Sequence, residues 1–358
     1  MKNNNENKIL NVPNLRFPEF SGEWENCQIA NILSIGSGRD YKHLEKGNIP
    51  VFGTGGYMTS VNECIYDGET TFIGRKGSIN KPFYYNGKFW TVDTLFYTHS
   101  FNKTTPKFVY CLFQTINWLR YNEASGVPSL SKDTIEKIKV FIPQLDEQRK
   151  ISEMLSVIDE RIATQNKIIE DLKKLKSAIS HILFSSKGAI HLSEIANVVM
   201  GQSPSSNAYN DQGLGMPLVQ GNLDISNGKT TPRLYTAEFN QTTEKGNIIL
   251  TVRAPVGEVA KATQKVCLGR GVCAIIPHKE NMSDFIYQYL TFYKFMWRRY
   301  EQGSTFTSIN GSDVRNIFCP KVRNVSILTL LDIKINIEER VVKQYQSQKQ
   351  YMLYQMFI

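Results

Sequence analysis

The sequence feature that most constrains this chain is a coiled-coil seam in the stretch from Pro143 to Phe184, which we predict to form one long helix. The seam advances in alternating steps of three and four residues, an average of about 3.5. Its positions are Leu155, Ile158, Ile162, Gln165, Ile169, Leu172, Lys176, Ile179 and Leu183. A helix with this spacing requires a partner helix to cover the seam.

The C-terminal segment of the same chain is predicted to be that partner. Its seam positions are Leu328, Leu331, Ile335, Glu338, Val342, Tyr345, Lys349, Met352 and Met356. When the two segments are aligned, Asp332 falls on Asp159 and Phe357 on Phe184 without a gap. The polar seam positions coincide as well, because Glu338 falls on Gln165 and Lys349 on Lys176. Two matched helices in one chain predict a tandem repeat.

The blocks that precede the two helices match in the same way. Five segments recur in one order and at a nearly constant separation: 29–33 with 195–199, 70–80 with 246–259, 89–99 with 266–276, 106–121 with 283–300, and 125–143 with 303–320. The residues between these segments differ freely. A shared scaffold with different loops is what two recognition units with different targets would need.

The first block is predicted to be an α+β domain with many loops. Glycine-bounded strands are expected within 48–58 and 70–85, a buried strand at 89–99, and a helix from Pro106 to Tyr121. A short helix capped by Asp133 and a final strand before Pro143 complete it. We therefore predict domains at 1–142 and 188–320, and helices at 143–187 and 321–358.

Composition indicates a globular protein without a membrane span or a metal site. The chain has 358 residues, of which 41% are hydrophobic, enough for a core in each domain. No stretch approaches the ~18 apolar residues of a membrane span, and the polar start lacks a signal peptide, so we expect a cytoplasmic protein. The six cysteines form no CxxC pair, and we expect buried free thiols rather than disulfides or zinc ligands.

The net charge of +9 is compatible with a polyanionic partner. The basic excess is spread over every segment, so contacts to a nucleic acid would have to come from placed side chains in folded domains. On charge alone, a protein that binds no nucleic acid is equally compatible.

Motifs for catalysis are missing from the sequence. There is no Asn/Asp-Pro-Pro-aromatic motif of an adenine methyltransferase, no GxxxxGK[ST] phosphate loop, and neither GxSxG nor HExxH. The glycine-rich stretch at 51–57 is interpreted as a turn, and Glu136 and Lys139 as surface charges on a short helix. We predict no catalytic residues.

Five segments together resemble one known family, the specificity subunits of type I restriction-modification systems. They are LRFPEFSGEWE at 15–25, RDYKHLEKGNIPVFGTGGYM at 39–58, IGRKGSINKP at 73–82, PQLDEQRKISEMLSVIDERI at 143–162 and MGQSPSSNAYN at 200–210. The resemblance covers nearly all of the chain. It implies two target recognition domains, each reading half of a split site on double-stranded DNA. It also implies that the two long helices form an antiparallel coiled coil between them, as a pseudo-twofold internal repeat.

The resemblance also implies partner subunits that perform the chemistry. Two methyltransferase subunits would dock on the helices, and two motor-nuclease subunits would join for cleavage. S-adenosylmethionine, ATP and Mg²⁺ would be bound by these partners, and the chain itself would bind no cofactor. One departure is that LDEQRKI follows Pro143, whereas KVRNVSI follows Pro320. The second helix therefore lacks the charged first turn. If that turn contacts a methyltransferase subunit, the two docking sites are unequal.

Polar residues in turns are the candidates for DNA contacts. Arg75, Lys76 and Ser78 lie in a glycine-flanked turn, and Arg253 lies in the matching turn of the second block. An arginine can bind guanine O6 and N7 as a bidentate fork, although a solvated turn charge or a phosphate contact explains these residues equally well. In the second block the candidates are amide and hydroxyl side chains, which suit adenine: Gln202, Ser203, Ser205, Asn207, Gln220 and Asn222.

Two further expectations concern spacing and alternatives. The seam from Leu155 to Leu183 corresponds to about 43 Å of helix, more than one turn of B-DNA at about 34–36 Å. We therefore expect a strict number of unread base pairs between two half-sites.

The alternatives are another kind of sequence-specific DNA-binding protein, or a silent or recombining specificity-subunit copy that never meets its partners. Co-purification with a methyltransferase subunit separates them.

Overall fold

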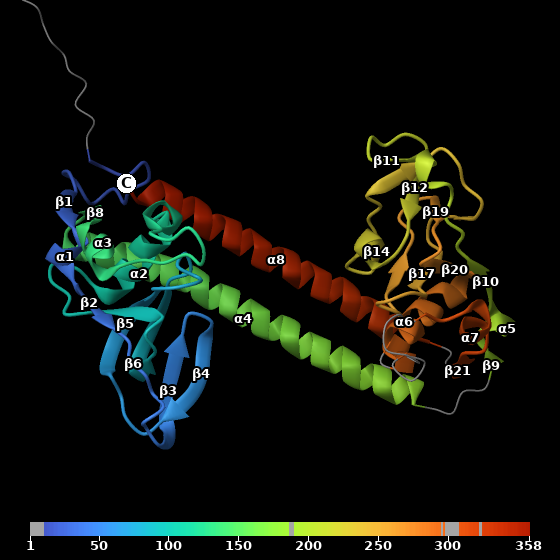
Figure 1. The fold of residues 1–358 in the computed structure, drawn as a ribbon, viewed down its shortest axis with the longest axis horizontal. Coiled ribbons are helices and arrows are strands. Elements are labelled where there is room, and N and C mark those ends of the chain that lie inside the picture. The colour runs from blue at the N-terminus through green and yellow to red at the C-terminus, as the bar shows by residue number, and fades with distance from the viewer. Residues whose placement is uncertain (1–10, 186–189, 295, 298–307, 322–323) are drawn as a thin grey trace, which may run out of the picture. The chain divides into compact units, whose positions relative to one another are not determined.

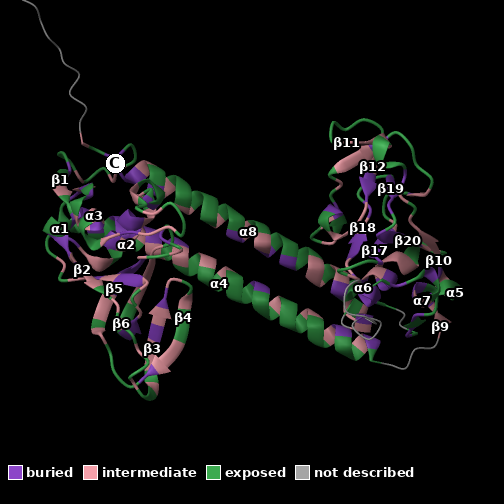
Figure 2. Cartoon of the chain, viewed as in Figure 1, coloured by how far each residue is buried: buried purple, intermediate pink, exposed green. Residues whose placement is uncertain are grey.

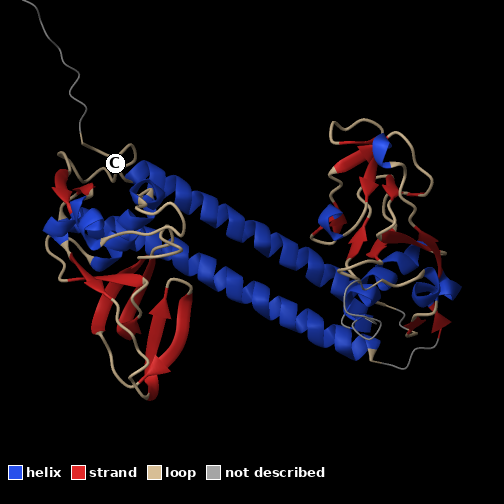
Figure 3. Ribbon diagram, viewed as in Figure 1, coloured by secondary structure: helices blue, strands red, loops and turns tan. Residues whose placement is uncertain are grey.

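The computed structural model describes residues 11–185, 190–294, 296–297, 308–321 and 324–358. Parts of the predicted segments 1–142, 143–187, 188–320 and 321–358 therefore lie outside the described residues. The chain divides into two compact units, Met1–Asn166 with Arg340–Ile358, and Lys167–Glu339. Both units combine helices with sheets (Figures 1 and 3), as the predicted α+β class requires.

The first unit is built on a mixed sheet with the strand order β2-β7-β5-β6-β3-β4 among its described residues. In this sheet β3 and β6 pair in parallel, and the other described neighbours pair antiparallel. A separate antiparallel pair joins β1 to β8 just before the first long helix. The strands are β1 Glu25–Gln28, β2 Ser34–Ser37, β3 Lys46–Gly53, β4 Gly56–Val61, β5 Tyr66–Gly74, β6 Phe83–Thr91, β7 Leu95–His99 and β8 Lys139–Ile142.

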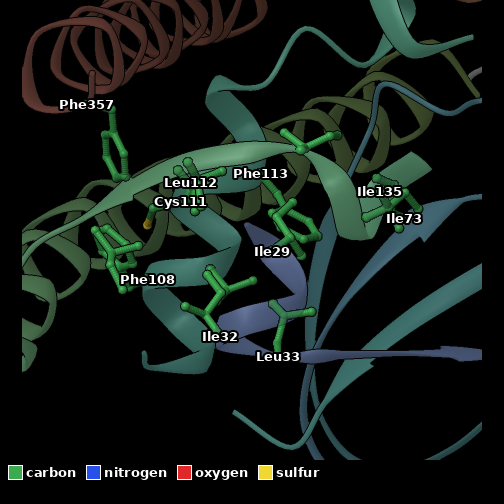
Figure 4. Close-up of a cluster of buried hydrophobic side chains, with 14 of the residues drawn as sticks. Ile29, Ile32, Leu33, Ile73, Phe108, Cys111, Leu112, Phe113, Ile135 and Phe357 are labelled. Atoms are coloured by element: carbon green, nitrogen blue, oxygen red, sulfur yellow. The ribbon is translucent and has the colours of Figure 1, made fainter. Parts of the chain in front are cut away.

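Helix α2 (Pro106–Thr115) forms the centre of the first unit's core. Thr105 caps it by accepting a hydrogen bond from the Phe108 amide, and Pro106 suits its first turn. Its apolar face buries Phe108, Leu112 and Phe113 together with α1 (Ile29–Ile32) and α3 (Lys132–Lys137) (Figure 4). The C-terminal Phe357 belongs to this core and stacks on Phe108 with ring centroids 5.4 Å apart.

Two local predictions for the first block are corrected by the structure. The helix predicted from Pro106 to Tyr121 ends at Thr115, and a 3-10 turn η1 (Trp118–Tyr121) follows. The buried Trp118 indole folds back there and donates to the Phe113 carbonyl at 2.8 Å. The cap of α3 is Ser131, not Asp133, because the Ser131 hydroxyl accepts from the Thr134 amide at 3.1 Å.

The second unit repeats this plan with more strands. One sheet has the order β10-β20-β17-β18-β14-β13, a second has β11-β15-β12-β19-β16, and β21 pairs with β9, all among the described residues. Helix α6 (Ser283–Tyr293) takes the place of α2. The strands are β9 Ile190–His191, β10 Ala196–Met200, β11 Tyr209–Asn210, β12 Met216–Val219, β13 Ile225–Ser226, β14 Lys229–Thr230, β15 Leu234–Thr236, β16 Thr242–Thr243, β17 Ile248–Thr251, β18 Val259–Lys261, β19 Val266–Leu268, β20 Val272–Pro277 and β21 Phe318–Cys319.

Short helices complete the second unit. They are α5 (Leu192–Ile195), α7 (Gly311–Arg315), and the 3-10 turns η2 (Ser206–Ala208), η3 (Asn222–Asp224) and η4 (Glu280–Met282). The core contains Phe184, whose ring packs edge-on against Phe285 of α6 at 6.2 Å. Phe357 and Phe108 make the corresponding contact in the first unit, so the repeat extends to the packing of the helix ends.

The two long helices are α4 (Leu145–Phe184) and α8 (Ser326–Met356), and each contributes to both units. All the predicted seam residues are buried or half-buried, and most of the residues between them are exposed (Figure 2). In the first unit Asp159 meets Lys349, and Arg161 lies over the Tyr345 ring. In the second unit the contacts are Lys173 with Glu339 and Lys176 with Asp332. Within each unit, residues that advance along α4 meet residues that retreat along α8, so the helices are antiparallel.

The starts of the two helices differ, as the sequence predicts. The repeat places Leu145 on Phe318, whereas α8 begins at Ser326. The charged first turn of α4 serves the first unit itself: the buried Glu147 carboxylate accepts two 2.7 Å hydrogen bonds from the Arg16 guanidinium. Gln148 donates to the carbonyls of Lys103 and Pro143. This turn therefore anchors the loops around it.

The six cysteines are free thiols, of which Cys111, Cys267, Cys273 and Cys319 are buried. Within the described ranges, no three His, Cys, Asp or Glu side chains come together as metal ligands would. None of the helices in the described part of the chain combines the length and the apolar character that crossing a bilayer requires.

Candidate nucleic-acid interface

The backbone hydrogen bonds around one loop cluster are the same in the two units. The amide of Arg39 donates to the Thr91 carbonyl, as that of Gln202 does to Leu268. The amide of Val92 donates to Phe52, as Gly269 does to Val219, and that of Arg75 to Thr94, as Val252 does to Gly271. Isolated bridges pair Lys76 with Ser129 and Arg253 with Ser308. These bonds place Asp40, Gly53, Lys76, Asp93 and Thr94 where the second unit has Ser203, Gln220, Arg253, Arg270 and Gly271.

The buried strand predicted at 89–99 is interrupted within this cluster. β6 ends at Thr91 and β7 begins at Leu95, just as β19 ends at Leu268 and β20 begins at Val272. A turn closes each gap, because the amide of Leu95 donates to the Val92 carbonyl at 3.0 Å and that of Val272 to Gly269 at 3.2 Å. Buried apolar residues on both sides of the turn suggest one strand, although the turn itself contains Asp93 or Arg270. The break puts a polar side chain at the surface of each unit.

In the second unit this cluster forms a hollow of about 180 Å³. Its lining combines three residues that the sequence singles out with one arginine that it does not: Ser203, Gln220, Arg253 and Arg270, with Gly221, Ala254 and Gly271. Both arginines are exposed. Arg270 lies between two glycines, the same signal that identifies Arg75, and the sequence interpretation missed it.

The backbone of the hollow is fixed by specific contacts. The Ser203 hydroxyl accepts from the amide of Arg270 at 3.1 Å. The buried Asp224 carboxylate accepts a hydrogen bond from the backbone amide of Gln220 at 2.8 Å and one from the Arg233 side chain at 3.0 Å. A side chain at Gly271 would begin 2.1 Å from the Gln220 carbonyl oxygen, so this position requires glycine. The loops therefore hold their polar side chains on a fixed base.

The other predicted contact residues of the second unit lie outside the lining of this hollow. Gln202 is exposed and immediately precedes Ser203, and its amide is bound to the Leu268 carbonyl. Ser205 and Asn207 are exposed at the turn η2. Asn222 begins η3 and is half-buried.

The three predicted contact residues of the first unit differ in their exposure and in their contacts. The half-buried Arg75 donates to the Asp93 carbonyl at 3.3 Å, and its guanidinium carbon lies 5.9 Å from the centre of the Phe96 ring. Lys76 is exposed and occupies the position of Arg253. Ser78 is exposed in the same loop. Lys76 is therefore the structural counterpart of Arg253.

The hollow of the first unit has a larger volume, about 780 Å³, and a different set of polar side chains. It is lined by Asp40, Tyr41, Lys42, Gly53, Thr54, Gly55, Met58, Val92, Asp93 and Thr94. At one matched position a hydrogen-bond acceptor replaces a donor, because Asp93 stands where the second unit has Arg270. At another, Gly53 stands where the second unit has Gln220, and the Met58 sulfur lies 2.8 Å from where a side chain at Gly53 would begin. The two hollows can therefore form different hydrogen bonds with the edges of nucleic-acid bases.

Comparison with known proteins gives one consistent result. The family model described as the type I restriction modification DNA specificity domain matches twice, at residues 21–174 and 188–344. A type I restriction enzyme specificity subunit of Methanocaldococcus jannaschii is 32% identical over 246 residues, which cover 61% of this chain and 58% of that protein. The chain thus spans less than two thirds of this relative.

Two solved structures share the fold over most of the chain. The crystal structure of a type I system S subunit from M. genitalium has a TM-score of 0.68 at 19% identity, covering 97% of this chain and 99% of that one. A structure from work on complex assembly and conformational transition of the type I system has a TM-score of 0.58 at 20% identity, covering 92% of this chain and 96% of that one.

Proposed function

Since the chain belongs to the type I restriction-modification DNA specificity family, we propose that it is the sequence-specificity subunit of such a complex. In this role it recognises a bipartite site on double-stranded DNA, with one half-site read by each unit. It directs adenine methylation and restriction by partner subunits. The family is the non-catalytic component that recognises DNA, and the proposed role for this chain is likewise non-catalytic.

The observation that carries the proposal is the pair of equivalent hollows. Their backbones make the same hydrogen bonds, yet their side chains differ at each of the matched positions Asp40, Gly53, Lys76 and Asp93. Any cation or neutral donor can contact a phosphate, but a carboxylate cannot, so the exchange of Arg270 for Asp93 excludes a phosphate contact common to both units. Readout of bases needs a different set of donors and acceptors for each sequence. The variation within a constant frame therefore supports two different base-reading sites.

Exposed apolar side chains on the helices support the docking of partner subunits. On α4 of the second unit, Ile168, Leu175 and Ile182 recur at heptad spacing outside the seam, and Ile182 is 78% exposed. On α8 of the same unit, Leu330 and Ile337 are exposed with the same spacing. Such stripes suit a protein partner. We assign them to methyltransferase subunits, two per complex, with two motor-nuclease subunits joining for restriction.

The cofactors follow from this division of labour. S-adenosylmethionine, ATP and Mg²⁺ are assigned to the partner subunits, in which the transfer and cleavage chemistry takes place. The purified chain alone is accordingly expected neither to methylate nor to cut DNA. Methyl transfer from S-adenosylmethionine by the isolated chain would contradict the assignment.

The test is detection of methylated adenines by long-read sequencing in cells that carry this chain with its methyltransferase subunit. We expect one bipartite motif, absent from cells that lack the chain. Absence of any motif despite co-purification of the two subunits would reject the proposal. A chain that binds one DNA sequence but never co-purifies with a methyltransferase would instead be another kind of sequence-specific DNA-binding protein, or a silent copy.

A further inference from the structure

The turn between β19 and β20 presents Arg270 with little freedom in its backbone. Its amide is held by the Ser203 hydroxyl, and the Gly269 amide donates to the Val219 carbonyl at 2.8 Å. A side chain at Gly269 would begin 3.0 Å from Gln220, and one at Gly271 would collide with the same residue. A rigid backbone under an exposed guanidinium is suited to a contact with fixed geometry.

The two arginines of the hollow are available to a ligand. Arg253 and Arg270 are exposed, and neither makes an ion pair with any described carboxylate, whereas Arg233, outside the lining of the hollow, binds Asp224. Arg253 comes from the loop after β17 and Arg270 from the turn before β20, so two separate segments converge on one hollow of about 180 Å³. Two guanidinium groups and the side chain of Gln220 therefore line the hollow.

The charge at the matched position of the first unit helps to decide whether Arg270 contacts a phosphate or a base. Asp93 lies in a turn whose neighbouring residues make the same backbone hydrogen bonds, but it has the opposite charge. A carboxylate at this position would be repelled by a phosphate, so the position is not a phosphate contact common to both units. Among base edges, guanine offers O6 and N7 as acceptors to an arginine, and cytosine offers its amino group to a carboxylate.

We propose that Arg270 is a specificity-determining residue of the second half-site, where it binds O6 and N7 of a guanine. This inference rests on the proposed function and deepens it. It predicts that the half-site read by the second unit contains a G·C pair that is lost from the motif when Arg270 is replaced.

The experiment compares methylated motifs in cells that carry the complete complex with wild-type chain, Arg270→Ala or Arg270→Gln. In both variants we expect one guanine of the second half-motif to become degenerate. Preference for that guanine should fall by roughly 5- to 150-fold, the range for one bidentate contact. The first half-motif should be unchanged, and this shows that each variant folds and assembles.

Lys279→Ala is the matched control, because it removes one positive charge beyond the other end of β20. The six residues of that strand separate it from Arg270 by roughly 20 Å. We expect the wild-type motif in this variant. A salt titration of DNA binding by the purified complex provides the second measurement.

Three outcomes would overturn the inference. One is an unchanged motif in both Arg270 variants. Another is binding that weakens equally on all sequences with a smaller salt dependence, which identifies a phosphate contact. The third is loss of both half-motifs, which identifies a structural role. Failure of the proposed function is distinguishable, because then the wild-type chain itself would direct no methylation.

Discussion

Lys349 of α8 binds both carboxylate oxygens of Asp159 on α4, at 2.6 and 2.8 Å. The equivalent pair in the other unit is Lys176 with Asp332, which meet at 2.5 Å, with donor and acceptor exchanged between the two helices. In each unit the pair also contacts the helix of its domain, although through different residues. Lys349 lies over the Tyr110 ring of α2, and Asp332 accepts a 2.7 Å hydrogen bond from Gln288 of α6. The repeat therefore reproduces the ion pair that connects α4 and α8 next to each domain.

Replacement of Lys349 by Met should destabilise the first unit. The lysine side chain is 12% exposed, so the change leaves Asp159 without its main partner in a partly buried site. We expect a loss of about 1–2 kcal/mol in the free energy of unfolding, measured by urea denaturation. Lys176→Met should have a similar effect through the second unit.

Lys174→Met is the control for that change, because its pair with Glu170 is largely exposed on the same helix. We expect no measurable loss of stability there. Equal stability of all three variants would show that the partly buried ion pairs contribute nothing to the stability of the helix packing.

Glu147→Gln should be more disruptive than a change in the repeated pair. The Glu147 carboxylate is 2% exposed and holds Arg16 in a bidentate contact. The change leaves a largely buried guanidinium without its counter-charge, and we expect a loss of about 2–4 kcal/mol. Denaturant unfolding measures it, with the exposed Asp146→Asn as control. A loss no larger than in that control would contradict the anchoring role of this turn.

Exchange of residues 188–320 for the equivalent block of a relative should change one half of the methylated motif. Each unit has its own loops on a shared frame, so its readout should be separable. Arg253→Ala tests the same idea on one residue, and we expect the second half-site to relax while the first is retained. Changes in both halves would mean that the units read DNA jointly.

The cysteines should react with iodoacetamide in two classes. Cys64 is exposed and should be alkylated first at pH 8. Burial raises the pKa of Cys111, Cys273 and Cys319 to about 12, so these thiols are neutral as well as inaccessible. We expect them to react only in denaturant, as followed by mass spectrometry. Early modification of Cys273 in the native protein would contradict the packing of the second core.

The same thiols predict a loss of stability in alkali. Burial raises their pKa to about 12, compared with an ordinary value of 9.0. Between these values the folded state binds more protons than the unfolded state, so the free energy of unfolding falls as pH rises. Thermal unfolding at pH 8 and pH 10.5 measures the fall, and Cys273→Ala should show a smaller one. An identical fall in that variant would exclude a contribution from this thiol.

The sequence by itself determined the long helices, their seam and the duplication. A heptad pattern is a local property that repeats over many turns of helix, so the letters alone align Asp159 with Asp332 and Lys176 with Lys349. They also indicate that the second helix lacks the charged first turn. The start of α8 at Ser326 agrees with this.

Only the tertiary structure decided which polar side chains share a site. Ser203, Gln220, Arg253 and Arg270 come from four separate loops, and their convergence depends on the pairing of strands distant in the chain. The sequence interpretation singled out three of them and missed Arg270, although Gly269 and Gly271 mark a turn there. Periodicity records which face of a strand is buried, but it does not show which loops from distant segments come together. The alignment of 89–99 with 266–276 already matches Arg270 with Asp93, but which other residues line a hollow with each of them depends on contacts between segments distant in the chain.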